Sequence, residues 1–518
     1  MISEVTLILD SGRLAREAVA GLTQRFEIRR DGQSRSRRTY FDTFDWRVYR
    51  EGGTLSAEPC GECWTLWWRR LDGGMRHRLN TTRIPEFARD LEAGAFRKEL
   101  AGITDIRRLL PLARVESDGE SLAILDRRRK TVVRVHHERG TASPGGTNST
   151  RPMVERLRIV PVLGYERDHA AVVSFLEEDL SLTRHDNGEL ALALATLGSP
   201  PCSYTSKLEL RLDPAMRADE AMRKILLVLL ETMRANVDGT RRDLDPEFLH
   251  DFRVAGRRTR SCLGQLKGVL DPDATGRFRG EFSWLGAVTG RTRDLDVYLL
   301  TMDAYRLEVP ESLRGGLDAL EEYLRKAQRS EQLRVARALA SPRYRELVRD
   351  WSLFLERSAG EQSGADCPDA ARTIELVAGE RVHKAFERVR KRGRNLSRHT
   401  PAQTVHRLRI DCKKLRYLFE FFRSLFEAER VSPFIRSLKE LQDHLGDFND
   451  LTVQQADLRK TAAEMLEGNS VAADTLLAMG CLVGRLERRQ RKLKRRVVDS
   501  VGSFVNEASC ARLRELVR

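Results

Sequence analysis

The sequence predicts a two-part protein, in which a β-rich α+β domain precedes an all-α domain of two tandem helical-bundle repeats. Three observations predict this fold class. In residues 1–212 apolar residues alternate, or form short runs, between Gly-rich turns, which is typical of strands. In residues 215–512 they recur at helical spacing over long segments. One segment of this second part also occurs twice, which indicates an internal repeat.

The first domain, residues 1–212, is expected to contain several strands and two helices. The predicted strands cover residues 4–9, 65–69, 131–136, 153–162 and 207–212. Helical spacing is found in residues 13–25 and 169–180. Residues 139–152 are rich in Gly, Ser, Thr and Pro, which predicts a flexible loop.

The second domain, residues 215–512, is expected to consist of two series of amphipathic helices. A polar segment at 360–368 separates halves of about 215–358 and 368–512. The first series covers residues 218–237, 247–269, 278–290, 294–305, 311–339 and 343–357. The second covers residues 368–391, 404–426, 436–445, 451–464 and 472–501, followed by a short end helix. The order of the helices therefore repeats.

One basic segment of the helical domain is written twice. Its first copy contains His250, Arg253, Arg257, Arg258 and Arg260, and its second contains His406, Arg409, Lys413, Lys414 and Arg416. The copies are 156 positions apart (406 − 250). Without a gap, the same shift superposes Leu285 on Leu441, Gly290 on Gly446 and Asp294 on Asp450. Such a repeat indicates two similar halves that offer positive charge to one ligand.

The spacing places most of these cations on one side of a helix. At about 100° per residue, offsets 0, 3, 7 and 10 fall within an arc of roughly 80°. The first stripe is thus His250, Arg253, Arg257 and Arg260, and the second stripe is His406, Arg409, Lys413 and Arg416. Apolar residues occupy the opposite side of each helix. No acidic residue lies within either stripe, so an anionic ligand explains the tolerated repulsion. Mixed Arg and Lys suit phosphate oxygens.

Other interpretations of these residues remain open at this point. A lone basic helix is typical of a solvated surface, and only the duplication argues against that reading here. Each histidine either contacts the ligand or holds a neighbouring backbone group. Asp294 and Asp450 are expected to cap helices or to pair with motif cations. Arg381, Lys384 and Arg388 form a further basic stripe before the second motif and are added to the predicted binding set.

Composition supports an anionic partner. The net charge is +15 and the pI is about 9.7, although acidic residues are plentiful. No signal-like or membrane-length apolar segment is found, so we expect a cytoplasmic protein that does not cross a membrane. The eight cysteines suit reduced thiols, and the Cys60–Cys63 spacing is read as a turn between strands.

At the duplicated segment the chain resembles the conserved histidine α-helical domain (CHAD) family, over about residues 215–510. Both His-x-x-Arg-x-x-x-basic-basic-x-Arg segments are present, and Leu285 and Leu441 begin segments similar to the family's Leu-Gly-x-x-x-Asp stretch. The resemblance implies that inorganic polyphosphate binds, without a chemical reaction, in a basic groove formed by both helices. The resemblance implies that the residues of both stripes, together with Arg258 and Lys414, bind this ligand.

Residues 1–210 resemble a diverged CYTH domain, the triphosphate-tunnel fold, which implies a tunnel-like barrel. Glu4 lies in the expected first strand, but Thr6 and Ile8 replace the second Glu and the Lys of the family's Glu-x-Glu-x-Lys pattern. The later Glu pair is reduced to Glu155, with Leu157 at the second position. We therefore expect no triphosphatase activity and predict no catalytic residue, metal or cofactor. A remaining basic tunnel would use Arg38, Arg50, Arg69, Arg83 and Lys207, unless these are ordinary surface charges.

Two other functions compete with polyphosphate binding. A nucleic-acid binder would also be basic, but the stripes carry no aromatic residues for base stacking. A triphosphatase would need metal ligands that are incomplete here. The sequence leaves open the oligomeric state, the chain length of polyphosphate, the role of the first domain and any association with polyphosphate granules.

Overall fold

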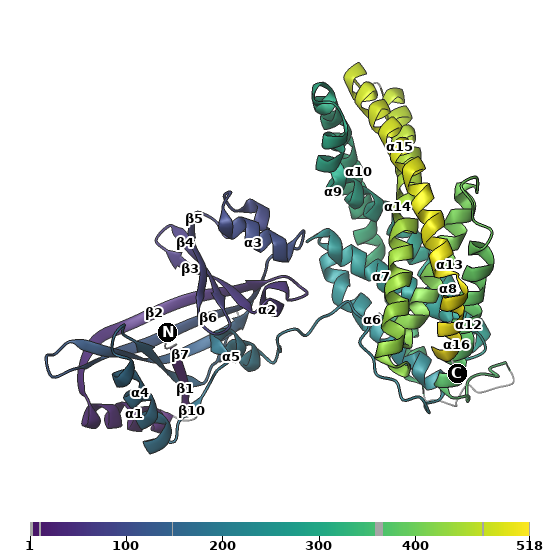
Figure 1. Ribbon diagram of the computed structural model, residues 1–518. Coiled ribbons are helices and arrows are strands. Elements are labelled where there is room, and N and C mark those ends of the chain that lie inside the picture. The colour runs from purple at the N-terminus through teal and green to yellow at the C-terminus, as the bar shows by residue number, and fades with distance from the viewer. Residues whose placement is uncertain (1–3, 10–11, 148, 358–365, 469–470, 517–518) are drawn as a thin grey trace. The chain divides into compact units, whose positions relative to one another are not determined.

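The computed structural model describes residues 4–9, 12–147, 149–357, 366–468 and 471–516, and Figure 1 shows its elements. The chain divides into one unit of residues 1–205 and a second of residues 206–518. The first unit is rich in antiparallel strands and the second is helical, which confirms the predicted fold class. The predicted linker at 360–368 lies largely outside the described residues.

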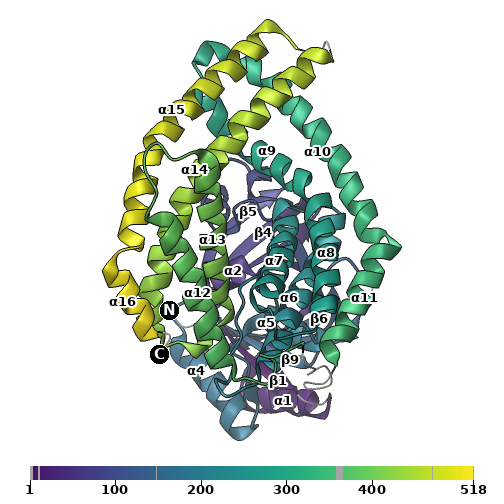
Figure 2. The same cartoon turned by 90° about the vertical axis from the view of Figure 1, so that its right-hand side faces the viewer.

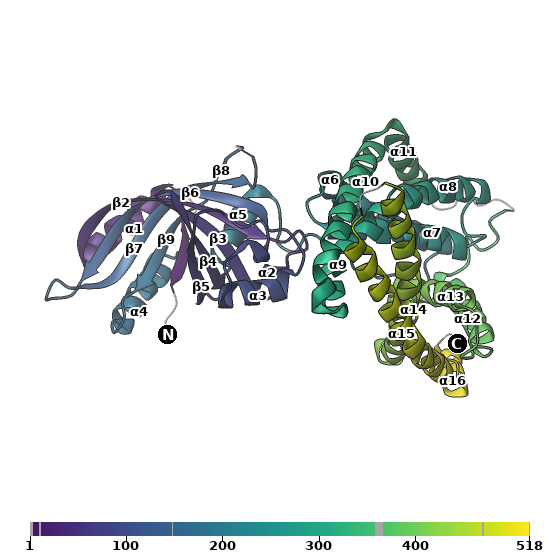
Figure 3. The ribbon, with the colours of Figure 1, turned by 90° about the horizontal axis from the view of Figure 1, so that it is seen from above.

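The first unit is built on one antiparallel sheet of ten strands. The strands are β1 (Val5–Leu9), β2 (Glu27–Asp42), β3 (Gly53–Cys60), β4 (Cys63–Arg70), β5 (Met75–Thr81), β6 (Leu110–Leu125), β7 (Thr131–Pro144), β8 (Arg151–Pro152), β9 (Glu155–Pro161) and β10 (Thr183–Arg184). Their order is β10-β1-β9-β7-β6-β2-β3-β4-β5, and β8 pairs with β7. Figure 3 shows these strands as one curved sheet. Cys60 and Cys63 face each other at the β3–β4 turn, as predicted.

Helices pack against this sheet through separate apolar clusters. Helix α1 (Gly12–Arg25) and helix α4 (Glu166–Ser174), which continues into a short π-helical turn at Phe175–Asp179, bury Leu22 and Val172 against β1 and β9. Helices α2 (Arg47–Arg50) and α3 (Ala95–Thr104) lie beside β2, β3 and β4. Helix α5 (Gly188–Leu197) packs on β6 and β7. Its first residues therefore reach the pocket described below.

Two local predictions for this part of the chain were wrong. Residues 139–152 are not wholly a loop, because β7 continues to Pro144 and pairs with β6 and with β8. Cross-strand pairing there outweighs a composition that favours turns. Residues 207–212 form no strand. The backbone N–H of Leu212 instead donates to the Ser424 hydroxyl at 3.0 Å, and its side chain is buried in the helical core.

The second unit repeats its helices at the spacing found in the sequence. The first series is α6 (Ala218–Arg241), α7 (Pro246–Gln265), α8 (Pro272–Val288), α9 (Gly290–Glu308), α10 (Leu317–Ala340) and α11 (Pro342–Glu356). The second is α12 (Ile374–Gly393), α13 (Ala402–Phe421), α14 (Ala428–Glu467), α15 (Ala473–Phe504) and α16 (Glu507–Leu516). Helices α7 and α13 begin 156 positions apart (402 − 246) and end 156 positions apart (421 − 265).

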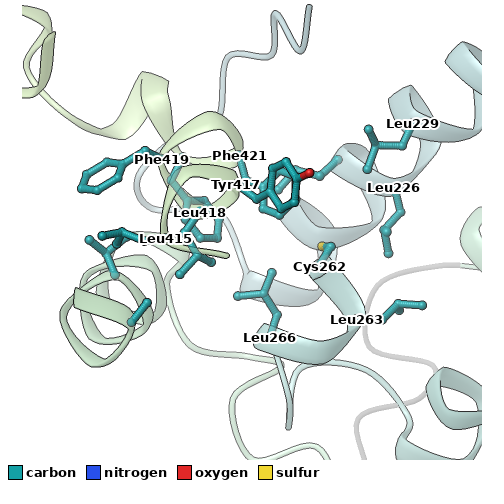
Figure 4. Packing of buried hydrophobic residues seen from close by; sticks show 14 of the residues in the cluster. Leu226, Leu229, Cys262, Leu263, Leu266, Leu415, Tyr417, Leu418, Phe419 and Phe421 are labelled. Atoms are coloured by element: carbon teal, nitrogen blue, oxygen red, sulfur yellow. The ribbon is translucent and has the colours of Figure 1, made fainter. Parts of the chain in front are cut away.

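The two series share their apolar interior. One buried cluster combines side chains from α6, α7 and α8 with others from α12, α13 and α14. Figure 4 shows Cys262 of α7, and Leu266 directly after this helix, close to Leu415 and Leu418 of α13. A second cluster joins α9 and α10 to α14 and α15, whose hairpins lie together in Figure 2. The repeats therefore form one body, and α7 and α13 lie next to each other in it.

Helix α14 corrects a predicted break. Residues 436–445 and 451–464 were expected to form separate helices, but α14 runs unbroken from Ala428 to Glu467. Leu445, Phe448 and Leu451 are buried on both sides of Gly446. A single helical glycine costs only about 1 kcal/mol, which this packing offsets. In the first series the equivalent stretch is interrupted at Thr289, between α8 and α9.

Candidate functional site

The core fixes the orientation of the two basic helices. Helix α7 begins at a cap in which the Asp245 carboxylate accepts the N–H groups of Glu247 and Phe248, with Pro246 in the first turn. Phe252 and Ala255 are buried on its core side. Helix α13 buries its own apolar residues, Leu408, Cys412 and Leu415, in the same way. Because the apolar side of each helix is buried, the basic stripe on its other side lies beside the neighbouring helices of the same repeat.

The first stripe lines a small cavity between α7 and α8. Arg253 donates to the Gly286 carbonyl oxygen at 3.0 Å and to the Thr289 hydroxyl at 2.7 Å, at the break between α8 and α9. Arg253, Arg257 and Arg260 line a cavity of about 70 Å³ together with Gly286. Apolar side chains of Met233, Phe252, Phe282 and Leu285 line the same space, so the cavity is only partly basic.

The second stripe is held by residues of α14. Arg409 lies 3.5 Å from the carboxylate of Asp450. His406 Nδ1 lies 2.5 Å from Oδ1 of Asn449. Because that amide oxygen is an acceptor, the imidazole donates from Nδ1, which fixes its tautomer. His406 is thus oriented by a side-chain amide and not by a backbone group.

The first stripe has an electrostatic effect on the second. Burial lowers the pKa of Lys413 to about 8, and repulsion from Arg409, from Arg257 and from Arg416 contributes. Arg257 belongs to α7, so the first stripe acts directly on the second. Burial and repulsion from Arg257 likewise lower the pKa of Arg253 to about 10. We refer to Arg253, Arg257, Arg409, Lys413 and Arg416 as the joint basic region.

Several guanidinium nitrogens in the joint basic region lack an acceptor. The Nε atoms of Arg253, Arg257 and Arg409 are buried and have no hydrogen-bond partner among the residues that the structure describes. A buried donor without a partner costs about 1–3 kcal/mol, and native proteins contain few of them. These donors are suited to oxygen acceptors.

Arg258 has a different environment from the stripes. It forms an ion pair with Glu420 of α13 at 2.8 Å and donates to the Ser206 carbonyl oxygen at 3.1 Å. Its side chain is only 13% exposed. The backbone carbonyl of Lys414, its counterpart, accepts a hydrogen bond from Gln265 of α7. The structure thus places Arg258 at the contact between the repeats, where it shares the Glu420 carboxylate with Arg416 of the joint basic region.

The additional stripe on α12 is not brought into the joint basic region. Arg381 is 18% exposed and pairs with Asp369, and it also donates to the Lys267 carbonyl oxygen at 2.9 Å. Lys384 and Arg388 are exposed and line a separate open groove of about 670 Å³. These residues add positive surface to the helical unit.

Acidic groups lie beside the stripes at the two predicted positions and at one further position. Asp294 and Asp450 lie inside α9 and α14 and cap neither helix. Asp450 pairs with Arg409, as one of the two predicted roles has it. Burial raises the pKa of Asp294, and the nearby Arg253 opposes this shift. Glu420, four residues after Arg416, also pairs with it at 3.0 Å, a signal that the helical spacing already contained.

In the first unit, only part of the predicted basic set lines the pocket. Arg38 and Arg69 line a pocket of about 280 Å³, and Arg50, Arg83 and Lys207 do not. The two motif positions of the later strand, Glu155 and Leu157, do not line the pocket either. Glu155 pairs with His137 and Arg139, while Leu157 is buried in an apolar cluster. The residues of β9 that line the pocket are Arg156 and Arg158.

Comparisons with known proteins agree with this division of the chain. The model of the CHAD domain family matches residues 224–459. Among curated proteins, none matches the chain. A solved CHAD domain from the plant Ricinus communis is 26% identical, with coverage of 60% of this chain and 96% of its own and a TM-score of 0.48. PptA from Streptomyces chartreusis is 16% identical, and the match covers 56% of this chain and 100% of PptA with a TM-score of 0.44.

A third structure is similar to the N-terminal region. It comes from Hippeastrum and is described as an adenylyl cyclase candidate with a dominant triphosphatase activity. It is 12% identical, with coverage of 39% of this chain and 99% of its own and a TM-score of 0.26. No helix among the described residues is long and apolar enough to span a membrane.

Proposed function

Because residues 224–459 form a CHAD domain, we propose that this protein binds inorganic polyphosphate without altering it. One observation carries the proposal: α7 and α13 pack in one buried core, which brings their basic stripes near enough for Arg257 to contribute to the lowered pKa of Lys413. Several fixed cations in one region suit a ligand whose negative charges repeat along a chain. The buried Nε atoms without acceptors support the same ligand. Both repeats then bind one chain of phosphates.

The pH dependence of binding tests this function. At pH 7 Lys413 is mostly protonated, and it loses its proton as the pH rises through about 8. A bound polyanion favours the charged form, so binding at higher pH must be accompanied by proton uptake. We expect the affinity for long-chain polyphosphate to fall up to about tenfold between pH 7 and pH 9. Calorimetry in buffers of different ionisation enthalpy measures the proton uptake directly.

Lys413→Arg is the matched control for the pH experiment. Arginine keeps its charge over this range, so the variant should bind with a flatter pH profile and take up less proton at pH 8. A pH profile that is identical in the wild type and Lys413→Arg would contradict the role of Lys413. No binding of polyphosphate at pH 7 would contradict the proposed function itself.

We further propose that the first unit does not hydrolyse triphosphates. The pocket carboxylates Glu4, Glu138 and Glu189 all pair with arginines, at 3.3, 2.8 and 2.6 Å, so they are not available to hold a divalent metal. Purified protein with Mg²⁺ or Mn²⁺ should leave tripolyphosphate and nucleoside triphosphates intact in a phosphate-release assay. Hydrolysis that Glu4→Gln abolishes would overturn this proposal.

A further inference from the structure

The pocket of the first unit holds a network of internal ion pairs. It has a volume of about 280 Å³ and is lined by β1, β2, β3, β4, β7, β9 and the start of α5. Arg156 is 2% exposed and donates to Glu138 at 2.9 Å and to Glu189 at 2.6 Å. Arg158 connects Glu138, at 2.8 Å, to Glu4, at 3.3 Å. Each of the carboxylates of Glu4, Glu138 and Glu189 therefore has an arginine guanidinium group beside it.

Glu189 closes the network at the start of α5. Its carboxylate accepts hydrogen bonds from Arg38, at 2.6 Å, and from the Tyr40 hydroxyl, also at 2.6 Å. These partners hold the pKa of Glu189 below its usual value despite its burial. A divalent cation would have to displace several arginines from such a site. Among the described residues, no group of three or more acidic, His or Cys side chains is placed to hold a metal.

Donors for one further anionic group remain in this pocket. Arg69 lies 4.9 Å from the ring centre of Trp67 and makes no ion pair with a described residue. The Nη1 atom of Arg156 and the Nδ1 atom of His136 are buried and have no hydrogen-bond partner in the described part of the chain. Both residues line the pocket, as Arg69 does. The other pocket arginines, Arg38, Arg70, Arg156 and Arg158, are each paired with a carboxylate.

This charge balance determines the class of ligand. A triphosphate brings several negative charges, and each one that is buried needs its own cation. Among the described residues that line the pocket, Arg69 is the arginine without a carboxylate partner, and Arg156 and His136 add further donors. Hydroxyl groups of Ser34, Ser36 and Thr54 also line the wall and suit a hydroxylated body.

We propose that this pocket binds a small polar molecule with a single phosphate or carboxylate group, and that it does so without a divalent metal. Arg69 forms the ion pair with that group. The arginine network takes the place that a metal would occupy between carboxylates and ligand. The proposal is independent of the helical unit and its polyphosphate.

The test uses the full-length protein in EDTA and in Mg²⁺. Glucose 6-phosphate is the phosphate probe, gluconate the carboxylate probe and tripolyphosphate the multiply charged comparison, with binding measured by calorimetry. At least one of the first two should bind in EDTA, and Mg²⁺ should change its affinity by less than about twofold. Arg69→Ala should weaken that binding by about tenfold or more, because a charge-assisted contact is lost.

Two variants make the outcome specific. Arg83 is exposed and lies outside the pocket, so Arg83→Ala should bind the probe like the wild type. Arg257→Glu with Lys413→Glu changes only the helical unit and should leave probe binding unchanged, whether or not polyphosphate binds there. The proposal is overturned if neither probe binds at millimolar concentration, if Arg69→Ala leaves the affinity intact, or if only tripolyphosphate with Mg²⁺ binds through Arg69.

Discussion

Arg257→Glu combined with Lys413→Glu should lower the affinity for long-chain polyphosphate by at least about 100-fold at physiological salt. Each substitution removes a charge-assisted contact of about 1.5–3 kcal/mol and adds repulsion to the ligand. Arg257 contributes to the lowered pKa of Lys413 in the other repeat, so the two residues connect the stripes. These positions are also preferable to Arg253, whose contacts with Gly286 and Thr289 hold α7 to α8.

The matched control for this pair keeps the same change in net charge. Arg329 and Arg345 are exposed on α10 and α11 and lie outside both stripes. Arg329→Glu with Arg345→Glu should weaken binding by less than about fivefold. These substitutions act on the ligand only through long-range electrostatic repulsion, which salt screens. Fluorescence titration and circular dichroism compare affinity and folding for both pairs. If the two double variants bind alike, net charge and not the stripes determines affinity.

Glu189→Ala should destabilise the first unit by about 3–5 kcal/mol. The substitution removes the carboxylate shared by Arg38 and by Arg156, whose side chain is 3% exposed, and leaves them only Glu58 and Glu138, respectively. It also removes the acceptor of the Tyr40 hydroxyl. Urea unfolding followed by tryptophan fluorescence measures the loss, since Trp46, Trp64, Trp67 and Trp68 all belong to this unit.

An exposed glutamate provides the comparison for Glu189. Glu92 is exposed, so Glu92→Ala should change the free energy of unfolding by less than about 0.5 kcal/mol. Glu189→Gln should be intermediate, because the amide keeps an acceptor for Tyr40 but loses the charge. Equal stability of Glu189→Ala and Glu92→Ala would show that the arginines are not held by this carboxylate.

The sequence was sufficient to predict the repeat and most of its helices, although α14 was expected as two. The ungapped shift that superposes His250 on His406 also places the ends of α7 and α13 at equivalent positions. This success has a physical reason. Amphipathic spacing and the cap before α7 are local signals, and both are strong in this part of the chain.

Other features depend on contacts that the sequence does not display. The pairing of Arg258 with Glu420 joins residues 162 positions apart, so no local pattern indicates it. Side chains alternate between the two faces of a sheet, so neighbouring residues of β9 face opposite sides. The pocket is therefore lined by Arg156 and Arg158 and not by Glu155 and Leu157. Strand β2 is mostly exposed and polar, so it lacks the alternation by which strands are predicted.

Competition between polyphosphate and nucleic acids tests the central claim most directly. The wild-type protein is saturated with labelled long-chain polyphosphate at physiological salt, and unlabelled polyphosphate, DNA or RNA is then added at equal phosphate concentration. Because the stripes carry no aromatic residue on which bases could stack, we expect polyphosphate to displace the label at far lower concentration than either nucleic acid. Displacement by DNA or RNA at equal or lower concentration would contradict the account.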